Sequence, residues 1–209
     1  MTYSVKETYY TLQGEGAHTG RAAVFLRFAG CNLWSGLERD RSSAVCTFCD
    51  TDFIGVDGPG GGKFVEAEAL AAHVASMWPG GGKPYVVCTG GEPLLQVDAA
   101  LIDALHAKGF EIGVETNGTV AAPAGLDWIC VSPKATAELK QVSGDELKLV
   151  YPQADAQPER FAGLAFKHFF LQPMDGPERS AAQDAAIAYC REHPQWRLSL
   201  QTHKLTGIP

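Results

Sequence analysis

Strand-like and helix-like segments alternate along most of this 209-residue chain, and this alternation limits the possible folds more than any other feature of the sequence. β-branched and aromatic residues predict strands at 23–28, 85–89, 110–115, 128–131, 147–151, 168–172 and 197–201. Apolar residues at helical spacing predict helices at 66–78, 97–109 and 180–192. Because strands that alternate with helices usually pair in parallel, we expect an α/β fold with a mostly parallel sheet, open or barrel-like.

Polar or reactive residues follow five of the predicted strands. They form the segments T-G-G-E-P (89–93), E-T-N-G (115–118), S-P-K (132–134), Q-P-M-D (172–175) and Q-T-H-K (201–204). Turns are polar in most proteins, so one such segment would carry little information. The carboxyl ends of parallel strands meet at one edge of the sheet, where ligands bind, so five in succession predict a binding site.

The composition limits the kinds of molecule that this protein is expected to bind. A net charge of -7 argues against direct binding of nucleic acid, which needs Lys and Arg to neutralise phosphates, and favours a small-molecule substrate. We expect a single domain over residues 1–209. The N-terminal residues include no apolar run, and no segment approaches the roughly 20 apolar residues of a membrane span. We therefore expect a cytoplasmic protein without a membrane partner.

Three of the six cysteines, Cys31, Cys46 and Cys49, fall in one polar segment with the spacing C-x14-C-x2-C. A closed zinc site needs a fourth ligand, and a redox C-x-x-C pair would leave Cys31 without a role. A 4Fe–4S cluster on three thiolates keeps one iron open to bind another molecule. The remaining cysteines lie in predicted strands or a helix and are expected to be buried: Cys88, Cys130 and Cys190.

Two of these features resemble motifs of the radical S-adenosylmethionine (SAM) superfamily. The pair Cys46-x2-Cys49, with Phe48 beside the second cysteine, resembles its cluster motif, and the segment 90–93 matches its G-G-E-P motif. Most members have three residues between the first two cysteines, whereas this chain has fourteen, so we interpret residues 34–45 as an insertion. Its polar and charged composition fits either a solvated excursion or a dimer contact.

The motifs taken together resemble one family within that superfamily, the 7-carboxy-7-deazaguanine synthases. The resemblance runs from residue 7 to the C-terminus, through Q-G-E-G (13–16), V-F-L-R-F-A-G-C-N-L (24–33), C-D-T (49–51) and the five strand-end segments. It implies a trimmed, incomplete (β/α) barrel of the radical SAM type, with mostly parallel strands and a cluster-bearing loop after the first barrel strand. A homodimer is also implied.

The activity implied by this resemblance is that of a carbon–nitrogen lyase. It converts 6-carboxy-5,6,7,8-tetrahydropterin to 7-carboxy-7-deazaguanine and ammonia, on the route to 7-deazapurines such as the queuosine of modified tRNA. The implied cofactors are a 4Fe–4S cluster, SAM and Mg²⁺, with an electron donor such as a flavodoxin or ferredoxin. When reduced, the cluster and SAM yield a 5′-deoxyadenosyl radical that abstracts a substrate hydrogen, so the site must exclude water.

The resemblance also assigns roles to individual residues. The cluster ligands are Cys31, Cys46 and Cys49. The residues implied in binding SAM are Phe48, Cys49, Asp50, Gly91, Glu92, Glu115, Asn117, Ser132, Pro133, Lys134, Gln172, Pro173, Met174 and Asp175. The residues implied in binding the substrate are Leu12, Gln13, Gly14, Glu15, Arg27, Thr89, His203 and Pro209. The catalytic candidates among these are Glu15, Arg27, Thr89 and His203.

The chemistry of a pterin supports several of these roles. Gln13 and Glu15 can read its edge of donors and acceptors, with Glu15 accepting from two N–H groups, and Arg27 can pair the substrate carboxylate in a two-bond fork. Thr51 offers a hydroxyl to Mg²⁺, which takes few protein ligands and completes its shell with water and substrate oxygens. We expect the tail 203–209 to close on the site and bring His203 and the carboxylate of Pro209 to the substrate.

Two other functions share part of this pattern. A radical SAM activase, which generates a glycyl radical on a partner protein, would need the cluster and G-G-E-P but would not explain Q-G-E-G or C-D-T. A small zinc-binding interaction module would explain the cysteines alone.

Overall fold

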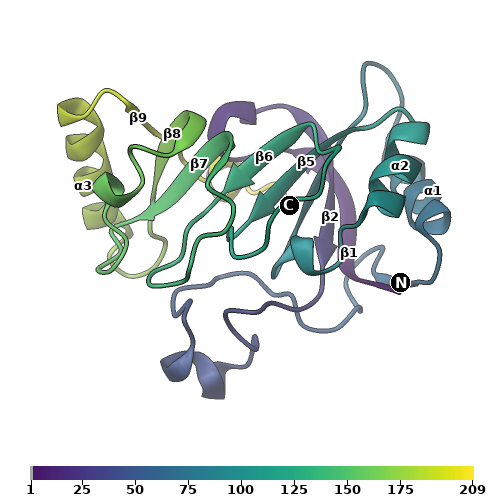
Figure 1. Ribbon diagram of the computed structural model, residues 1–209, viewed down its shortest axis with the longest axis horizontal. Helices are drawn as coiled ribbons and strands as arrows, with labels where there is room; N and C mark the ends of the chain where they lie inside the picture. Colours follow the sequence, from purple (N-terminus) through teal and green to yellow (C-terminus); the bar gives the residue numbers. More distant parts are fainter. Residues whose placement is uncertain (1) are drawn as a thin grey trace.

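A single nine-stranded sheet forms the centre of the computed structural model, which describes residues 2–209 (Figure 1). The strands are β1 (Tyr3–Leu12), β2 (Ala22–Phe28), β3 (Gly62–Phe64), β4 (Tyr85–Gly90), β5 (Glu111–Thr116), β6 (Trp128–Val131), β7 (Ser143–Tyr151), β8 (Ala165–Pro173) and β9 (Trp196–Leu198). Their order is β3-β1-β2-β4-β5-β6-β7-β8-β9. Neighbours from β2 to β9 pair in parallel, while β1 pairs antiparallel with β2 and β3. The sheet does not close, so the expected trimmed barrel with mostly parallel strands is confirmed.

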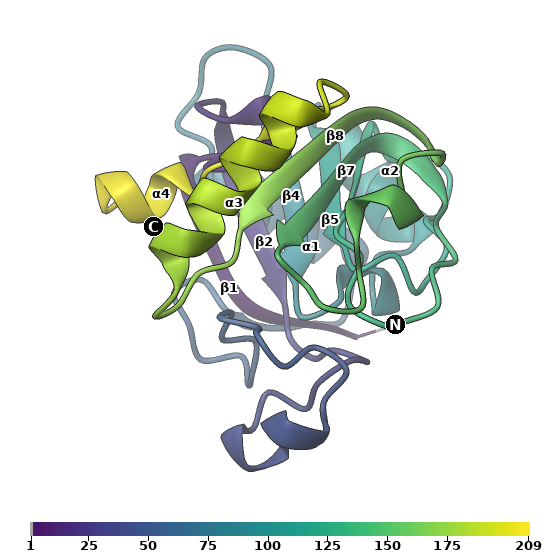
Figure 2. The same ribbon diagram turned by 90° about the vertical axis from the view of Figure 1, so that its left-hand side faces the viewer.

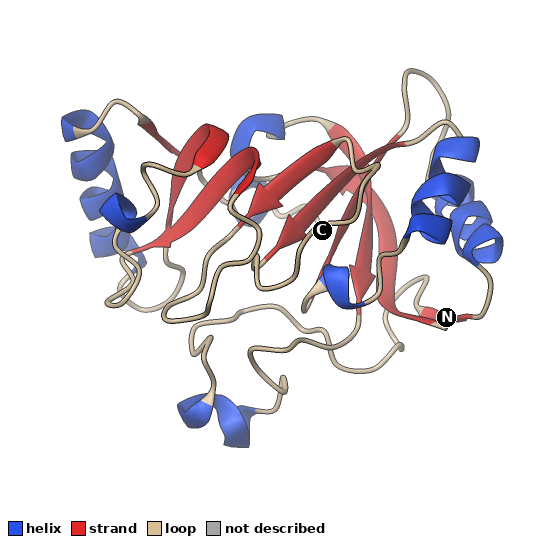
Figure 3. Cartoon of the chain, in the orientation of Figure 1, coloured by secondary structure: helices blue, strands red, loops and turns tan. Residues whose placement is uncertain are grey.

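The three longer helices lie at the two ends of the curved sheet, with α1 and α2 at one end and α3 at the other (Figures 1 and 3). They are α1 (Ala67–Met77), α2 (Ala99–Ala107), α3 (Arg179–Glu192) and the short C-terminal α4 (Thr202–Thr206). Asp98 caps α2, since its Oδ1 accepts a hydrogen bond from the Leu101 amide at 3.0 Å. Gly109 follows the end of this helix with φ of +81°, a left-handed conformation that glycine adopts readily. Short 3₁₀ turns cover Gly16–His18, Glu38–Ser43, Pro93–Leu95 and Pro158–Arg160.

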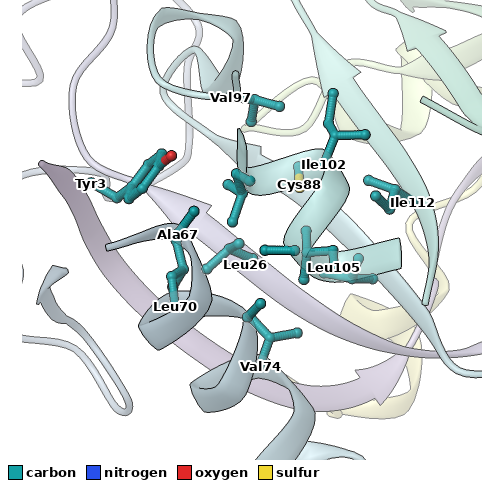
Figure 4. Close-up of a cluster of buried hydrophobic side chains, with 14 of the residues drawn as sticks. Tyr3, Leu26, Ala67, Leu70, Val74, Cys88, Val97, Ile102, Leu105 and Ile112 are labelled. Atoms are coloured by element: carbon teal, nitrogen blue, oxygen red, sulfur yellow. The ribbon is translucent and has the colours of Figure 1, made fainter. Parts of the chain in front are cut away.

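Two apolar clusters hold these layers together. The larger one packs α1 and α2 against the first half of the sheet, with Leu26, Leu70 and Leu105 fully buried (Figure 4). The second packs α3 against β7 and β8 around Leu149 and Leu171. Each fully buried aliphatic side chain contributes about 2 kcal/mol by leaving water, so the clusters make the sheet a rigid support. As expected, Cys88 and Cys130 are buried, while Cys190 is partly buried.

The sequence-based elements match most of the structure, but the strands β1 and β3 are not among them and the last predicted strand extends too far. No strand was predicted for β1, whose buried residues include the polar Lys6 and Thr8 and so break an apolar pattern. The expected strand at 197–201 is wrong in its second half. The chain leaves the sheet after Leu198 and forms α4, where the Thr202 amide donates to Gly14 O at 2.9 Å. Within residues 2–209, no helix is long and apolar enough to cross a membrane.

Candidate active site

A cavity of about 440 Å³ opens at the carboxyl ends of the parallel strands. Every one of the five polar segments that follow a predicted strand contributes lining residues, which confirms that these segments meet in one place. With three exceptions, every site residue predicted from the sequence lines this cavity. The exceptions are Cys31, Glu92 and Pro133. The volume falls in the range that suits small-molecule ligands.

Lys148, on β7, forms a buried ion-pair network with two carboxylates on one wall of the cavity. Its Nζ lies 2.6 Å from Glu15 Oε2 and 3.0 Å from Glu115 Oε2. Gln201 Nε2 donates to Glu15 Oε1 at 3.0 Å, and Gln13 Nε2 donates to Glu115 Oε1 at 2.7 Å. Gln13 and Glu15, the residues expected to read a pterin edge, therefore lie side by side in one hydrogen-bonded network with the predicted SAM-binding residue Glu115.

The positive charge of Lys148 keeps the carboxyl group of Glu15 on this wall ionised. Burial alone would raise the pKa of Glu15, but the lysine charge and the hydrogen bonds from Lys148 and Gln201 outweigh it and lower the pKa to about 2. Lys148 also loses water by burial, and the carboxylates of Glu115 and Glu15 raise its pKa well above the usual range. Glu15 is thus held as a carboxylate, which acts only as an acceptor.

Arg27 has partners within the protein that the sequence did not reveal. Its Nε donates to Glu7 Oε1 at 2.7 Å and its Nη2 donates to Tyr9 OH at 3.0 Å, both from the neighbouring strand β1. Arg27, Glu7 and Tyr9 all line the cavity. The guanidinium is therefore oriented by β1, and a carboxylate that binds it has to share it with Glu7.

Glu92 of the G-G-E-P turn does not reach the cavity. Its side chain is fully buried, accepting from Leu94 N at 3.0 Å, Thr116 Oγ1 at 2.7 Å and Asn117 N at 2.8 Å. Of the two predicted SAM-binding residues in this turn, Gly91 lines the cavity and Glu92 does not. Three donors from the turn and from the end of β5 occupy the carboxylate, which instead fixes the turn against β5.

The close approach of this turn to the first cysteine requires glycine. A Cβ added to Gly91 would lie 2.1 Å from Gly30 O and 2.8 Å from Cys31 Cβ, closer than side chains pack. Cys31 is consequently placed under the turn, while Cys46 and Cys49 line the cavity. The hydrogen bond with Cys46 and the amide of Thr51 lower the pKa of Cys49 to about 6, against the opposing effect of burial.

The other predicted cofactor residues form the opposite part of the rim. Lys134 Nζ donates to Ser132 Oγ at 2.5 Å and lies 6.0 Å from the centre of the Phe48 ring. Pro133, between them, is not among the residues that line the cavity, and its carbonyl oxygen accepts from Gln153 Nε2 at 3.4 Å.

The C-terminal segment contributes residues to the cavity wall. Lys204 Nζ donates to Asp50 Oδ2 at 2.5 Å and to Asp175 Oδ2 at 2.6 Å, which ties α4 to the cysteine loop and to the end of β8 (Figure 2). Pro209 lines the cavity, and its carbonyl oxygen accepts from Thr11 Oγ1 at 3.0 Å. His203 also lines the cavity.

Comparison with known proteins identifies the family. The Radical SAM superfamily profile matches residues 41–152. A 7-carboxy-7-deazaguanine synthase of Caulobacter vibrioides is 67% identical over 210 residues, and that of Bordetella pertussis is 65% identical over 212 residues, each with 100% of both chains covered. This chain belongs to the 7-carboxy-7-deazaguanine synthase family. The sequence-based resemblance is thereby confirmed.

A solved structure supports the same family at the level of the fold. The crystal structure of QueE from Escherichia coli matches with a TM-score of 0.70 and 27% identity, covering 96% of this chain and 94% of that one. The comparisons give no support to a glycyl-radical activase. As a member of the 7-carboxy-7-deazaguanine synthase family, the chain carries the cofactors that the radical SAM superfamily implies, a 4Fe–4S cluster and SAM.

The donor set of the three cysteines suits an iron–sulfur cluster, whose ligands are thiolates. Within residues 2–209, no group of three His, Cys, Asp or Glu side chains is close enough to hold one ion. The thiolates of a 4Fe–4S cluster each bind a different iron and therefore stand further apart than the ligands of one zinc ion. The hydrogen bond between Cys46 and Cys49 lowers the pKa of Cys49 and raises that of Cys46, and metal binding releases the protons of such thiols.

Several residues that line the cavity were not among the predicted site residues, and they include Lys148, Glu7 and Lys204. Lys148 did leave a signal, because a lysine in the middle of the apolar strand L-K-L-V-Y needs a buried partner. Glu7 lies in the strand that was not predicted, and Lys204 depends on how the C-terminal segment folds back.

Proposed function

We propose that this chain converts 6-carboxy-5,6,7,8-tetrahydropterin to 7-carboxy-7-deazaguanine and ammonia, in the biosynthesis of 7-deazapurines. One observation carries the proposal: Cys46 and Cys49, the G-G-E-P turn and the Gln13–Glu15 segment meet in one cavity. The names of relatives that are 67% and 65% identical over their full length support it.

The cluster would be held by Cys31, Cys46 and Cys49, and together with SAM it would supply the radical that abstracts hydrogen from the substrate. The SAM side of the cavity would be formed by Phe48, Ser132, Lys134 and the segment 172–175, which line it at the ends of β6 and β8 or, for Phe48, in the cysteine loop.

The pterin would bind on the wall formed by Gln13 and Glu15. Glu15 is ionised and already accepts from Lys148 and Gln201, and a carboxylate has about four acceptor positions, so about two are left for substrate N–H groups. Arg27, oriented by Glu7 and Tyr9, would pair the substrate carboxylate. Thr89 and His203 line the same cavity and would contact the ring and the acid group.

Mg²⁺ would bind next to Thr51, whose side chain lies on the cavity wall beside Asp50 and Asp52. Hard oxygen ligands of this kind suit magnesium, which keeps most of its shell for water and substrate. We also propose that the enzyme is a cytoplasmic homodimer of single-domain chains that receives its electron from a flavodoxin or ferredoxin.

An anaerobic assay tests the proposed activity. The purified protein, reconstituted with iron and sulfide, is supplied with SAM, dithionite, Mg²⁺ and the carboxytetrahydropterin, and 7-carboxy-7-deazaguanine is measured by chromatography. Formation of the product without any partner protein is expected. If the substrate is not consumed by protein that carries a cluster, the proposal is wrong.

Two cysteine variants make this test specific. Cys31→Ala removes a proposed ligand and should abolish product formation and leave an incomplete cluster. Cys190→Ala, a change on α3 away from the cavity, should retain both. Full activity in Cys31→Ala would overturn the assignment of the first ligand.

A further inference from the structure

The insertion at residues 34–45 returns to the cysteine loop through one side chain. Figures 1 and 2 show the segment around Glu38–Ser43 standing away from the sheet. From this turn Arg41 Nη1 donates to Thr47 O and to Cys49 O, both at 3.0 Å. One N–H-bearing nitrogen thus joins two carbonyls within the C-x2-C loop.

The guanidinium is itself held from two sides. Its Nε lies 2.8 and 2.9 Å from the two carboxylate oxygens of Glu38, and its carbon lies 4.1 Å from the centre of the Trp34 ring. Trp34 is only 8% exposed and packs edge-on against Phe53, with ring centres 5.6 Å apart. Such stacking and forked bonding fix an arginine where it would otherwise be mobile.

We propose that Arg41 is a positioning residue that holds the Cys46–Cys49 loop in the shape required for cluster binding. The inference rests on the proposed function, because it concerns the cluster that these cysteines would hold. It explains the long spacing between Cys31 and Cys46, since the added residues supply Arg41 together with Glu38 and Trp34 that orient it.

Both the charge of the Arg41 guanidinium and the geometry of its hydrogen bonds contribute to holding the Cys46–Cys49 loop. Bonds from a charged donor are stronger than neutral ones, so the guanidinium restricts the turn at Thr47 and Phe48 more than water would. Its positive charge is also bonded to the carbonyl oxygen of Cys49, a proposed cluster ligand, and a cation near a cluster favours the reduced form, which carries one more negative charge.

The test uses the full-length protein reconstituted with iron and sulfide. Arg41→Gln removes the charge and the bridge, Arg41→Lys keeps the charge alone, and Arg39→Gln is the matched control. Arg39 lies in the same turn but its side chain is 80% exposed, against 29% for Arg41. The two readouts are the rate of iron release to a chelator without oxygen and the midpoint potential followed by electron paramagnetic resonance.

Arg41→Gln is expected to release iron about tenfold faster than wild type, by loss of charged hydrogen bonds, and to have a more negative potential. Arg41→Lys should restore most of the potential but only part of the slow release, and Arg39→Gln should match wild type in both. Because the side chain is partly exposed, the cluster-free Arg41→Gln protein should keep the wild-type circular dichroism spectrum. A failure of that folded variant to take up a cluster would also support the proposal.

Equal release rates and potentials in Arg41→Gln, Arg39→Gln and wild type would overturn this inference and leave the proposed function standing. A wild-type protein that takes up no iron at all would overturn both. Should Arg41→Gln fail to fold, Arg41→Lys decides: wild-type iron release in that variant contradicts the need for the bridging bonds.

Discussion

At the scale of single residues, Lys148 is the side chain on which the acidic wall of the site depends. Its side chain lies between Glu15 and Glu115 and is only 4% exposed to solvent. Two buried carboxylates without a cation would repel each other, and one would take up a proton. A protonated Glu15 could no longer accept two N–H groups from a substrate.

Replacing this lysine should therefore impair both stability and substrate binding. Lys148→Met keeps the length of the side chain and removes its charge, which leaves two partly buried carboxylates without their cation at a cost of about 2 kcal/mol. We expect the KM for the pterin to rise about tenfold or more, from the loss of an ionised acceptor. Denaturant unfolding and steady-state kinetics measure the two effects. Lys167→Met, at an exposed position on β8, is the control and should change neither.

The ion pair between Lys148 and Glu15 also determines how stability and substrate binding depend on pH. The pKa of Glu15 is about 2 in the folded protein and 4.5 for the free side chain, so its contribution to stability is complete above about pH 4.5 and is lost as the pH falls toward 2. In Lys148→Met, burial dominates and raises the pKa of Glu15, so substrate binding should weaken at mildly acidic pH where the wild type is unaffected. A pH-independent KM in the variant would show that Lys148 does not control Glu15.

At the scale of helices and strands, the sequence predicts those elements whose residues form a recognisable local pattern. The strand ends at Thr89, Glu115 and Gln172 were predictable, because a β-branched run followed by a polar turn is a local signal. The strand β1 and the helix α4 were not, since β1 carries Lys6 in a buried position and α4 is held by distant partners. For the same reason Glu92 could be located but its burial by Thr116 and Asn117 could not.

The contact between the β4 turn and the first cysteine yields a prediction about glycine. Gly91→Ala would place a Cβ against Gly30 O and Cys31, neither of which belongs to a flexible side chain, so the two segments must separate. A loss of about 2 kcal/mol, typical of overpacking, and a fall in iron content after reconstitution are expected. Gly163→Ala is the control, because its added Cβ meets nothing within 4 Å. Normal iron content in Gly91→Ala would mean that the close approach is dispensable.

The ion pairs that join Lys204 of α4 to Asp50 and Asp175 should hold the C-terminal segment in place but contribute little to the stability of the whole protein. Lys204 and its partners are between 27% and 49% exposed, and ion pairs of this kind contribute about 1 kcal/mol or less. Lys204→Met should therefore leave the melting temperature almost unchanged but raise hydrogen exchange in residues 202–206 by about fivefold. Mass spectrometry of the C-terminal peptide measures this, with Lys108→Met at the end of α2 as control. Unchanged exchange would show that other contacts hold the tail.

At the scale of the whole molecule, the site draws on nearly the entire chain. The residues that line the cavity range from Lys6 on β1 to Pro209, and they include the ends of β4, β5, β7 and β8. Opening any one of these elements exposes the cavity. A ligand that binds only the closed arrangement must therefore stabilise the fold as a unit, since binding to the native state alone shifts the unfolding equilibrium.

SAM binding should therefore raise the stability of the whole protein. With the cluster in place and SAM at about one hundred times its dissociation constant, stability should rise by about 2.7 kcal/mol. For a chain of this length the melting temperature should increase by roughly 5 to 10 °C. Anaerobic calorimetry measures it, and the rise should grow with the logarithm of SAM concentration. The Cys31→Ala protein without added iron and sulfide is the control and should respond weakly, because the open iron that would chelate SAM is missing. An equal rise in both proteins would place SAM elsewhere than at the cluster.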